Sequence, residues 1–529
     1  MLKAYQWYFS RPLWVDEQMI LLNARDRSFS GLIGALWMDQ AAPLGWLALQ
    51  KAILETFGTS DRGVRVLPVL FGIGAIWVAW WVAQRWLHPV TAAVLVGLFS
   101  ISQWMTYYAL EVKPYSADAF WALLLPALVI WAGEARERQA MSLVRTAAWW
   151  CIAFVGQWFS FGATFVTPAC GLILCATALR RLGVRGAAVV AAQGLIWLVG
   201  FGAHYTMSMR QASNDDFLRT YWAAGFAPKS AGATEALRWL FAQAEPLASH
   251  PGGTALWIAF WLSAAYGIAV LIAKRPVMGL VALAVPLSAC VLALFHVVPF
   301  NDRLALWTTP ALYLGIAAAA GHIFEHIGAP RSVRWFVSAA VALVFGFSAW
   351  TVVTDIVVKG NERVIIGGDN HGLDDGRGIR LLMRQRQPGD VILATHMSLP
   401  GLWWYGDVNI DDQHRGQTVT ADGGPILEIR HVWFASEGCH RTTRLRMLSD
   451  ALAGASRAAV YLGFGSDVPE GLQQLVLDDL GQLGLRVFYS PVGQEGVAAI
   501  YDLKQPPETA PASASTVQGC VGVRKAERW

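Results

Sequence analysis

Two carboxylates stand side by side near the start of the chain, in Trp14-Val15-Asp16-Glu17. They come just before a long series of apolar segments. An ionised group at a membrane boundary loses hydration, so an acidic pair at such a place indicates a functional site. The chemistry that suits the pair is removal of a proton, with Asp16 or Glu17 as a general base. The alternative is an ordinary solvated or helix-capping pair.

A second polar cluster, YYALEVKPY over residues 107–115, lies where another apolar segment reaches a membrane face. Within it, Lys113 has the charge to meet a phosphate, and Tyr115 has a hydroxyl to donate to one. Glu111 is suited to hold Lys113 in place or to share a divalent metal ion with Asp16. The alternatives are an interfacial ion pair of Glu111 with Lys113, which is worth little, and a Lys113 side chain that reaches lipid head groups.

Arg303 adds a further positive charge, in the short turn Asn301-Asp302-Arg303. It is a second candidate for holding a phosphate, and the alternative is an anchor at a helix end. A base together with phosphate-binding cations suits the transfer of a sugar with inversion. The base takes the proton of the acceptor, and the cations hold the phosphate leaving group.

Other sites are absent from the sequence. It contains no Walker A loop, no GxSxG elbow and no glycine-rich dinucleotide fingerprint after a strand, and its histidines show no zinc-binding spacing. ATP-driven transport within this chain is therefore disfavoured. No cofactor is certain, and a divalent metal ion, held by Asp16 and Glu111 if by any residues, is left open.

The composition indicates a membrane protein that crosses the bilayer many times. Of the 529 residues, 55% are hydrophobic and only 15% are charged, whereas soluble proteins are about 25% charged. The mean hydropathy is +0.41, and the 26 tryptophans suit rings placed at membrane–water boundaries. The net charge of +4 is small for a chain of this length, and no basic run with interleaved aromatics argues for a nucleic-acid partner.

The apolar segments predict about ten spans, because a span needs about 20 predominantly apolar residues. The predicted spans are residues 65–84, 90–109, 116–132, 147–162, 164–180, 187–207, 255–273, 277–297, 304–321 and 335–354. Basic residues follow every odd-numbered span, which places those loops in the cytoplasm. The alternate loops and the tail from about residue 355 are then extracytoplasmic, as are both polar clusters.

The segments around these spans complete the predicted organisation. Residues 1–64 form an extracytoplasmic first loop with interfacial helices, and residues 65–354 form the transmembrane core. Such a first loop has no preceding span, so we expect that one lies upstream of this start or survives as a fragment in residues 2–9. Strands alternate with helices over residues 355–505, which predicts a small extracytoplasmic α/β domain. Residues 506–529 are expected to form a flexible tail.

The cysteines divide into two groups. Four of them lie in apolar spans, where Cys is most often a small core residue. Cys439 and Cys520 lie in the polar C-terminal region. A disulfide between these two is a candidate if the region is extracytoplasmic, although sequence spacing does not establish that they are close.

Several motifs, in order, resemble those of the GT-C membrane glycosyltransferases. This family includes the protein O-mannosyltransferases, the aminoarabinose transferases of lipid A and the bacterial dolichyl-phosphate-mannose-transferase-like proteins. RPLWVDE at 11–17 resembles the first-loop motif of the family, and YALEVKPY at 108–115 is similar to its Tyr-x-x-Glu-x-Arg-x-Tyr turn. The other matching segments are QAAPL at 40–44, FGTS at 57–60, RVLP at 65–68 and PFNDR at 299–303, the last resembling the family's arginine-bearing turn.

The resemblance implies a polyprenyl-phosphate-linked sugar donor, an extracytoplasmic glycan, lipid or protein as acceptor, and inversion at the anomeric carbon. It implies that Asp16 is the base, or a metal ligand if the acceptor is a phosphate, with Glu17 in support. Lys113 and Arg303 would hold the donor phosphate. The implied location is the bacterial inner membrane, with hexosyl or pentosyl transfer to a cell-envelope glycan such as lipopolysaccharide.

The chain departs from the family pattern at two of these positions. Lys113 stands where the better-known branches have an arginine, so it lacks the bidentate fork. Gln40 stands where some branches have a histidine. Two other functions are alternatives: a transporter or flippase of a lipid-linked glycan, and a non-catalytic membrane protein that binds envelope glycan. A transporter favours charged or broken spans at mid-membrane and repeated halves, whereas the charges here lie at the boundaries.

Overall fold

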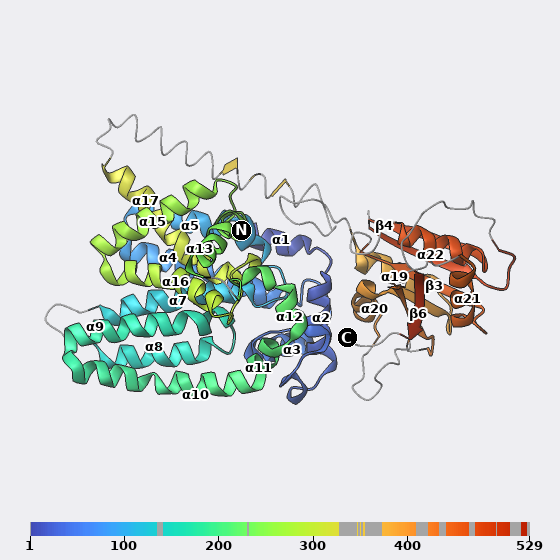
Figure 1. Ribbon diagram of the computed structural model, residues 1–529, viewed down its shortest axis with the longest axis horizontal. Helices are drawn as coiled ribbons and strands as arrows, with labels where there is room; N and C mark the ends of the chain where they lie inside the picture. The colour runs from blue at the N-terminus through green and yellow to red at the C-terminus, as the bar shows by residue number, and fades with distance from the viewer. Residues whose placement is uncertain are drawn as a thin grey trace. The chain divides into compact units, whose positions relative to one another are not determined.

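Figure 1 shows the computed structural model of the protein, which describes residues 2–134, 141–229, 232–326, 346–347, 350, 353–354, 373–408, 420, 422–432, 441–464, 471–493, 495–507 and 520–525. The chain divides into two compact units. We call them the helical unit (Met1–Tyr8 and Gly31–Val358) and the α/β unit (Phe9–Ser30 and Lys359–Trp529). The mainly α-helical membrane fold with a small C-terminal α/β region, as the sequence predicted, is confirmed.

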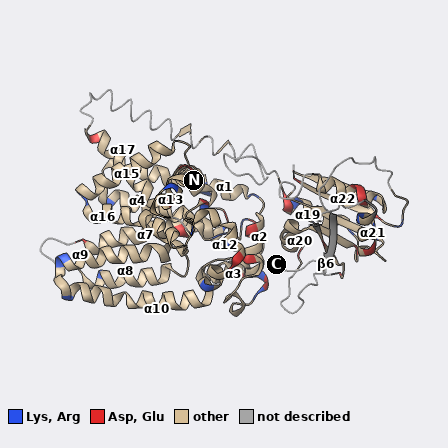
Figure 2. Ribbon diagram, in the orientation of Figure 1, with Lys and Arg blue, Asp and Glu red and all other residues tan. Residues whose placement is uncertain are grey.

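The helical unit consists of long apolar helices joined by short connections. In chain order its helices are α1 (Leu2–Phe9), α3 (Leu44–Phe57), α4 (Val66–Trp86), α5 (Pro89–Ile101), α6 (Gln103–Tyr107), α7 (Tyr115–Gly133), α8 (Leu143–Gly156), α9 (Phe161–Gln193), α10 (Leu195–His204), α11 (Arg210–Asn214), α12 (Asp216–Tyr221), α13 (Ala233–Ala242), α14 (Ala244–Ser249), α15 (Trp257–Lys274), α16 (Pro276–Leu294) and α17 (Thr309–His326). Short turns of helix also occur, among them η4 (Ala223–Gly225) and η5 (Asp302–Thr308). Figure 2 shows long stretches of these helices without charged residues, with Lys and Arg gathered near helix ends such as that of α9.

In the described part of the chain, six helical runs are long and apolar enough to cross a membrane, and α5 and α8 are shorter apolar helices. The predicted spans 164–180 and 187–207 fall in one long run, Phe161–Asn214. Gly183 interrupts this run with a φ of 72°, a conformation that costs glycine little. The predicted span 335–354 lies mostly outside the described residues. The total of ten spans therefore stays a prediction.

Small residues let the helices approach closely. A Cβ atom added to Gly267 on α15 would lie 1.7 Å from the carbonyl oxygen of Gly315 on α17. In Figure 1, α7, α8 and α9 pack side by side, and α10 lies against α8. The start of α7 is tied to the start of α9, because Asp118 accepts hydrogen bonds from Ser160 Oγ (2.6 Å) and from the amide of Gly162 (3.0 Å).

The α/β unit contains a six-stranded sheet in the order β4-β5-β3-β1-β2-β6. The strands are β1 (Val391–Thr395), β2 (Ile426–Val432), β3 (Arg457–Leu462), β4 (Leu485–Val492), β5 (Gly496–Asp502) and β6 (Cys520–Lys525). β1 pairs in parallel with β2 and β3, and the remaining pairs are antiparallel. The helices of the unit are α2 (Val15–Asp26), α19 (Asp375–Gln385), α20 (Leu399–Tyr405), α21 (Arg441–Ala451) and α22 (Leu472–Gly481).

The two faces of the sheet follow from the alternation of side chains along each strand. Leu393 and Val460 point to the face that packs with α21 and α22. Tyr461, the next residue along β3, points to the opposite face, where it contacts α19. The alternation of strands and helices predicted for this region is found, and it extends further: β6 lies within residues 506–529, where a flexible tail was expected.

Candidate functional site

The turn between α6 and α7 is firmly held in the helical unit. Arg65 is fully buried, and its Nε donates a hydrogen bond of 2.8 Å to the carbonyl oxygen of Leu110. Ser102 caps α6 by accepting from the amide of Met105. The predicted cluster at residues 107–115 is therefore a fixed part of the fold, with its charged and aromatic side chains presented from a rigid element.

Arg303 lies against two aromatic rings. Its guanidinium carbon is 5.9 Å from the ring centroid of Tyr115 and 5.2 Å from that of Trp222. Both distances suit cation–π contacts. The chain beside Trp222 is joined to the Arg303 turn, since the amide of Phe300 donates to the carbonyl oxygen of Gly225 at 2.7 Å. The structure thus brings Arg303, Tyr115 and Trp222 together.

Lys113 and Glu111 are both nearly buried, with exposed fractions of 6% and 2%. Lys113 Nζ donates a hydrogen bond of 2.5 Å to Gln40 Oε1. Its amide donates to the carbonyl oxygen of Glu111 at 2.7 Å. A buried ammonium requires partners, and Gln40 is one that the sequence did not identify. The burial of both charges argues against a solvated surface pair.

Tyr108 is the side chain around which the charged groups gather. Its side chain is buried, and the carboxylates of Asp302 and Glu111 and the guanidinium of Arg303 lie close enough to interact with it electrostatically. The Tyr108 ring also meets the Tyr115 ring edge to face at 5.1 Å. The Tyr108 ring is thus surrounded by Glu111, Tyr115, Asp302 and Arg303. We call these five residues the Arg303 cluster.

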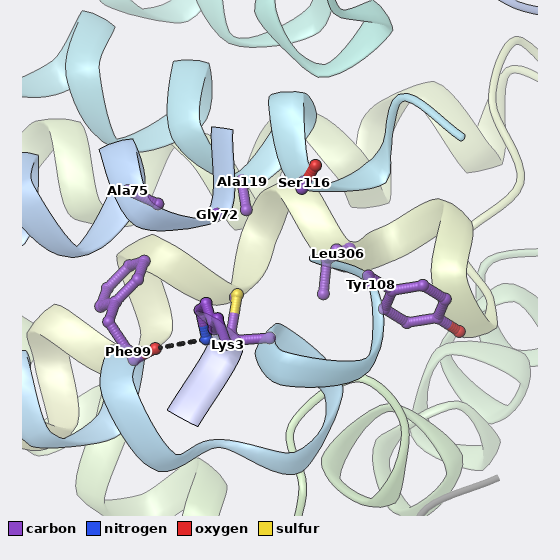
Figure 3. Close-up of a pocket in the computed structure, with 9 residues that line it drawn as sticks. Lys3, Gly72, Ala75, Phe99, Tyr108, Ser116, Ala119 and Leu306 are labelled. Carbon is purple, nitrogen blue, oxygen red and sulfur yellow. Dashed lines mark hydrogen bonds between the residues drawn. The ribbon is translucent and has the colours of Figure 1, made fainter. Parts of the chain in front are cut away.

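A small pocket opens beside this cluster, on the other side of the Tyr108 ring. Its lining residues are Lys3, Gly72, Ala75, Phe99, Met105, Tyr108, Ser116, Ala119 and Leu306. Lys3 Nζ donates to the carbonyl oxygen of Phe99 at 3.1 Å and to Thr106 Oγ1 at 3.3 Å. Figure 3 shows that the Tyr108 hydroxyl points away from Lys3. The ring of Tyr108 therefore separates the Lys3 pocket from its own hydroxyl group.

Asp16 and Glu17 lie in the first turn of α2, in the α/β unit. Glu17 is fully buried, and its Oε2 accepts a hydrogen bond of 2.7 Å from the amide of Trp14. This is the helix-capping role that the sequence offered as an alternative. Asp16 is partly exposed at the same helix end. The catalytic roles of Asp16 and Glu17, and their association with the Arg303 cluster, stay predictions.

α2 is fastened to the rest of the α/β unit by buried polar contacts. Gln18 Nε2 donates to Asp375 Oδ2 at 3.1 Å, and the Tyr461 hydroxyl donates to Asp375 Oδ1. The amide of Leu13 donates to the Tyr405 hydroxyl at 2.9 Å. The helix that carries Asp16 is therefore a structural part of this unit, whereas the sequence grouped it with a separate first loop of residues 1–64.

Two further predictions concern metal and disulfide sites. Within the described ranges, no group of three or more His, Cys, Asp or Glu side chains is placed to hold a metal ion. Cys439 lies outside the described residues. The candidate Cys439–Cys520 disulfide and the metal proposal for Asp16 and Glu111 therefore stay predictions.

The known proteins that match this chain are found by comparison of structures. No family model matches the sequence, and no curated protein matches it. The apo crystal structure of ArnT from Cupriavidus metallidurans has a TM-score of 0.53 at 13% identity, covering 96% of this chain and 97% of ArnT. The structure of the same protein bound to undecaprenyl phosphate has a TM-score of 0.51 at 13% identity, covering 94% and 96%. The chain therefore shares its fold with ArnT.

Proposed function

We propose that the protein is an inverting glycosyltransferase that moves a sugar from a polyprenyl-phosphate-linked donor to an extracytoplasmic glycan, lipid or protein. The proposal places it in a bacterial inner membrane, with the α/β unit and the Arg303 cluster on the extracytoplasmic side. Its support is the GT-C fold over almost the whole chain together with the residues of the cluster. ArnT, with the same fold, binds undecaprenyl phosphate.

The observation that carries the proposal is the arrangement of cations around Tyr115. Arg303 lies over the ring of Tyr115, and Lys113 is two residues before it in the same turn. A planar guanidinium can bind two phosphate oxygens at once, and an ammonium adds a point charge. Both cations stand at the start of an apolar helical run, since α7 begins at Tyr115 and η5 leads into α17. A lipid-linked phosphate has the same combination of an anionic head and an apolar chain.

In the proposed reaction, one set of residues stabilises the donor phosphate and another takes the proton of the acceptor. Arg303 and Lys113 stabilise the phosphate as the bond to the anomeric carbon breaks, and Tyr115 donates to a phosphate oxygen. The acceptor oxygen attacks that carbon from the opposite side, which inverts it, and its proton passes to a carboxylate. We assign this base role to Asp16 on the sequence motif that it shares with the family. Glu17, as the helix cap, holds the turn that carries Asp16.

The proposal is tested by transfer of label from a set of radiolabelled polyprenyl-phosphate sugars in membranes that contain the protein. We expect Arg303→Gln to reduce transfer by a factor of about 10² to 10³, the usual cost of removing one preorganised group that stabilises developing charge. Arg303→Lys should retain part of the activity. The control is Arg275→Gln, at the exposed end of α15. Equal transfer by the wild type and Arg303→Gln would contradict the proposal.

A further inference from the structure

Three side chains from separate segments form a hydrogen-bonded chain beside Arg303. His250 lies in the middle, just after α14. Its Nε2 is 2.5 Å from the hydroxyl oxygen of Tyr108, and its Nδ1 is 2.6 Å from Oδ1 of Asp302. The sequence does not mark His250 as a site residue, because no second ligand stands at metal-ligand spacing from it. The contacts with Tyr108 and Asp302 join residues that are far apart in the chain.

The direction of each hydrogen bond follows from the groups involved. An ionised carboxylate only accepts, so Nδ1 of His250 carries the proton and donates to Asp302. In the neutral imidazole, Nε2 then accepts, and the Tyr108 hydroxyl is its donor. The two hydrogen bonds therefore link the Tyr108 hydroxyl to the His250 imidazole, and the imidazole to the Asp302 carboxylate.

The imidazole of His250 is held in place by its surroundings. The ring of Trp104 stacks on it, with centroids 3.5 Å apart and planes at 12°. Trp104 Nε1 also donates to the carbonyl oxygen of Ser249 at 2.8 Å, which fixes the residue before the histidine. A side chain clamped in this way on a connecting segment positions its neighbours, because its own hydrogen-bond geometry is set in advance.

Asp302 is the group whose orientation matters for anion binding. It directly precedes Arg303, and its carboxylate lies close enough to Arg303 to interact with it electrostatically. Its Oδ1 accepts from His250 Nδ1 and also from the backbone amide of Arg303, at 2.5 Å. A carboxylate that turned to the neighbouring guanidinium would compete with a bound phosphate, because the two anions use the same donors.

We propose that His250 is a positioning residue for Arg303: by engaging the Asp302 carboxylate, it holds the guanidinium of Arg303 on Tyr115 and Trp222, in the orientation that binds a lipid-linked phosphate. The inference rests on the proposed function. It predicts that the loss of His250 weakens phosphate binding through Asp302. A second substitution that removes the Asp302 charge should therefore restore phosphate binding.

The test is binding of undecaprenyl phosphate, compared with uncharged undecaprenol, to the full chain in nanodiscs. His250→Ala should weaken phosphate binding about tenfold, the effect of about one charge-assisted hydrogen bond. Adding Asp302→Asn to His250→Ala should restore affinity to within about twofold. His250→Asn should keep most of the affinity, since its amide nitrogen can replace Nδ1 as the donor to Asp302.

A matched control is available on α15 and α17, where His322 Nδ1 lies 2.8 Å from the hydroxyl of Tyr266. His322→Ala removes a similar histidine–tyrosine bond and should leave phosphate binding unchanged. Unchanged binding in His250→Ala, or binding in the double variant that is no tighter than in His250→Ala, would overturn the inference and leave the proposed function standing. Equal affinity of the wild type for the phosphate and the alcohol would instead contradict the proposed function and the inference with it.

Discussion

One buried carboxylate contributes to the attachment of the Asp16 helix to the α/β unit, and Asp375→Ala should loosen this attachment. Asp375 is almost completely buried. It accepts hydrogen bonds from Gln18 Nε2 on α2 and from the Tyr461 hydroxyl on β3. Burial and the neighbouring Asp375 charge raise the pKa of Tyr461, so its hydroxyl stays a donor. Alanine leaves both donors buried without this acceptor.

The expected loss of stability at α2 follows from the two hydrogen bonds that Asp375→Ala removes. Hydrogen bonds to a charged group contribute about 1.5–3 kcal/mol each. Removing the buried charge also removes its desolvation cost, so the lower end of the sum, about 3 kcal/mol, is the expected loss. Asp375→Asn keeps one oxygen as an acceptor and should cost about half as much.

Hydrogen exchange of the α2 amides in the full chain measures this loss directly, because it reports local opening. A loss of about 3 kcal/mol corresponds to exchange about 150-fold faster over Val15–Asp26. The control is Asp450→Ala, which removes an exposed carboxylate on α21. Exchange of α2 at the same rate in Asp375→Ala and in the wild type would show that Asp375 does not hold α2 in place.

Three further predictions follow from other parts of the structure. Gly267→Ala should destabilise the helical unit, because its new methyl group would lie against the Gly315 carbonyl oxygen; a lower thermal midpoint in detergent checks this. The hydrogen bond from Arg386 lowers the pKa of Asp422 to about 2. The ionised Asp422 therefore stabilises the fold above about pH 4, and this stabilisation is lost as the pH falls towards 2. In Asp422→Asn, the free energy of unfolding should no longer change with pH in this range. Lys113→Gln should reduce label transfer at least tenfold, since it removes a phosphate-binding charge, and unchanged transfer would exclude Lys113 from the site.

Much of the fold could be predicted because it depends on local patterns. Apolar runs of about 20 residues marked α4, α7, α15, α16 and α17. Short apolar runs between helical segments marked β1, β3, β4 and β5. β6 was missed because pairing with β2 comes from distant chain segments, and its own surroundings are rich in Pro, Ala and Ser.

The candidate site was predicted only in part, for a related reason. Arg303 and Tyr115 were found because charged and aromatic groups at membrane boundaries stand out in an apolar chain. His250 was missed because it lies 142 residues from Tyr108, in a loop without a regular pattern. Gln40 was read as a departure from a family motif, and its contact with Lys113 spans 73 residues. The bond between Gln18 and Asp375 spans 357 residues. No periodic pattern in the sequence predicts a contact between residues so far apart in the chain.

The proposed function requires Asp16 to take the proton of the acceptor while the sugar leaves the polyprenyl phosphate. The most direct measurement is label transfer in membranes that contain either the wild type or Asp16→Asn, with Asp450→Asn as the control, over several donor sugars. Asparagine keeps the shape of Asp16 but cannot take the acceptor's proton. We expect transfer from one donor by the wild type and by Asp450→Asn, and none by Asp16→Asn. Equal transfer by the wild type and Asp16→Asn would contradict the proposed role of Asp16.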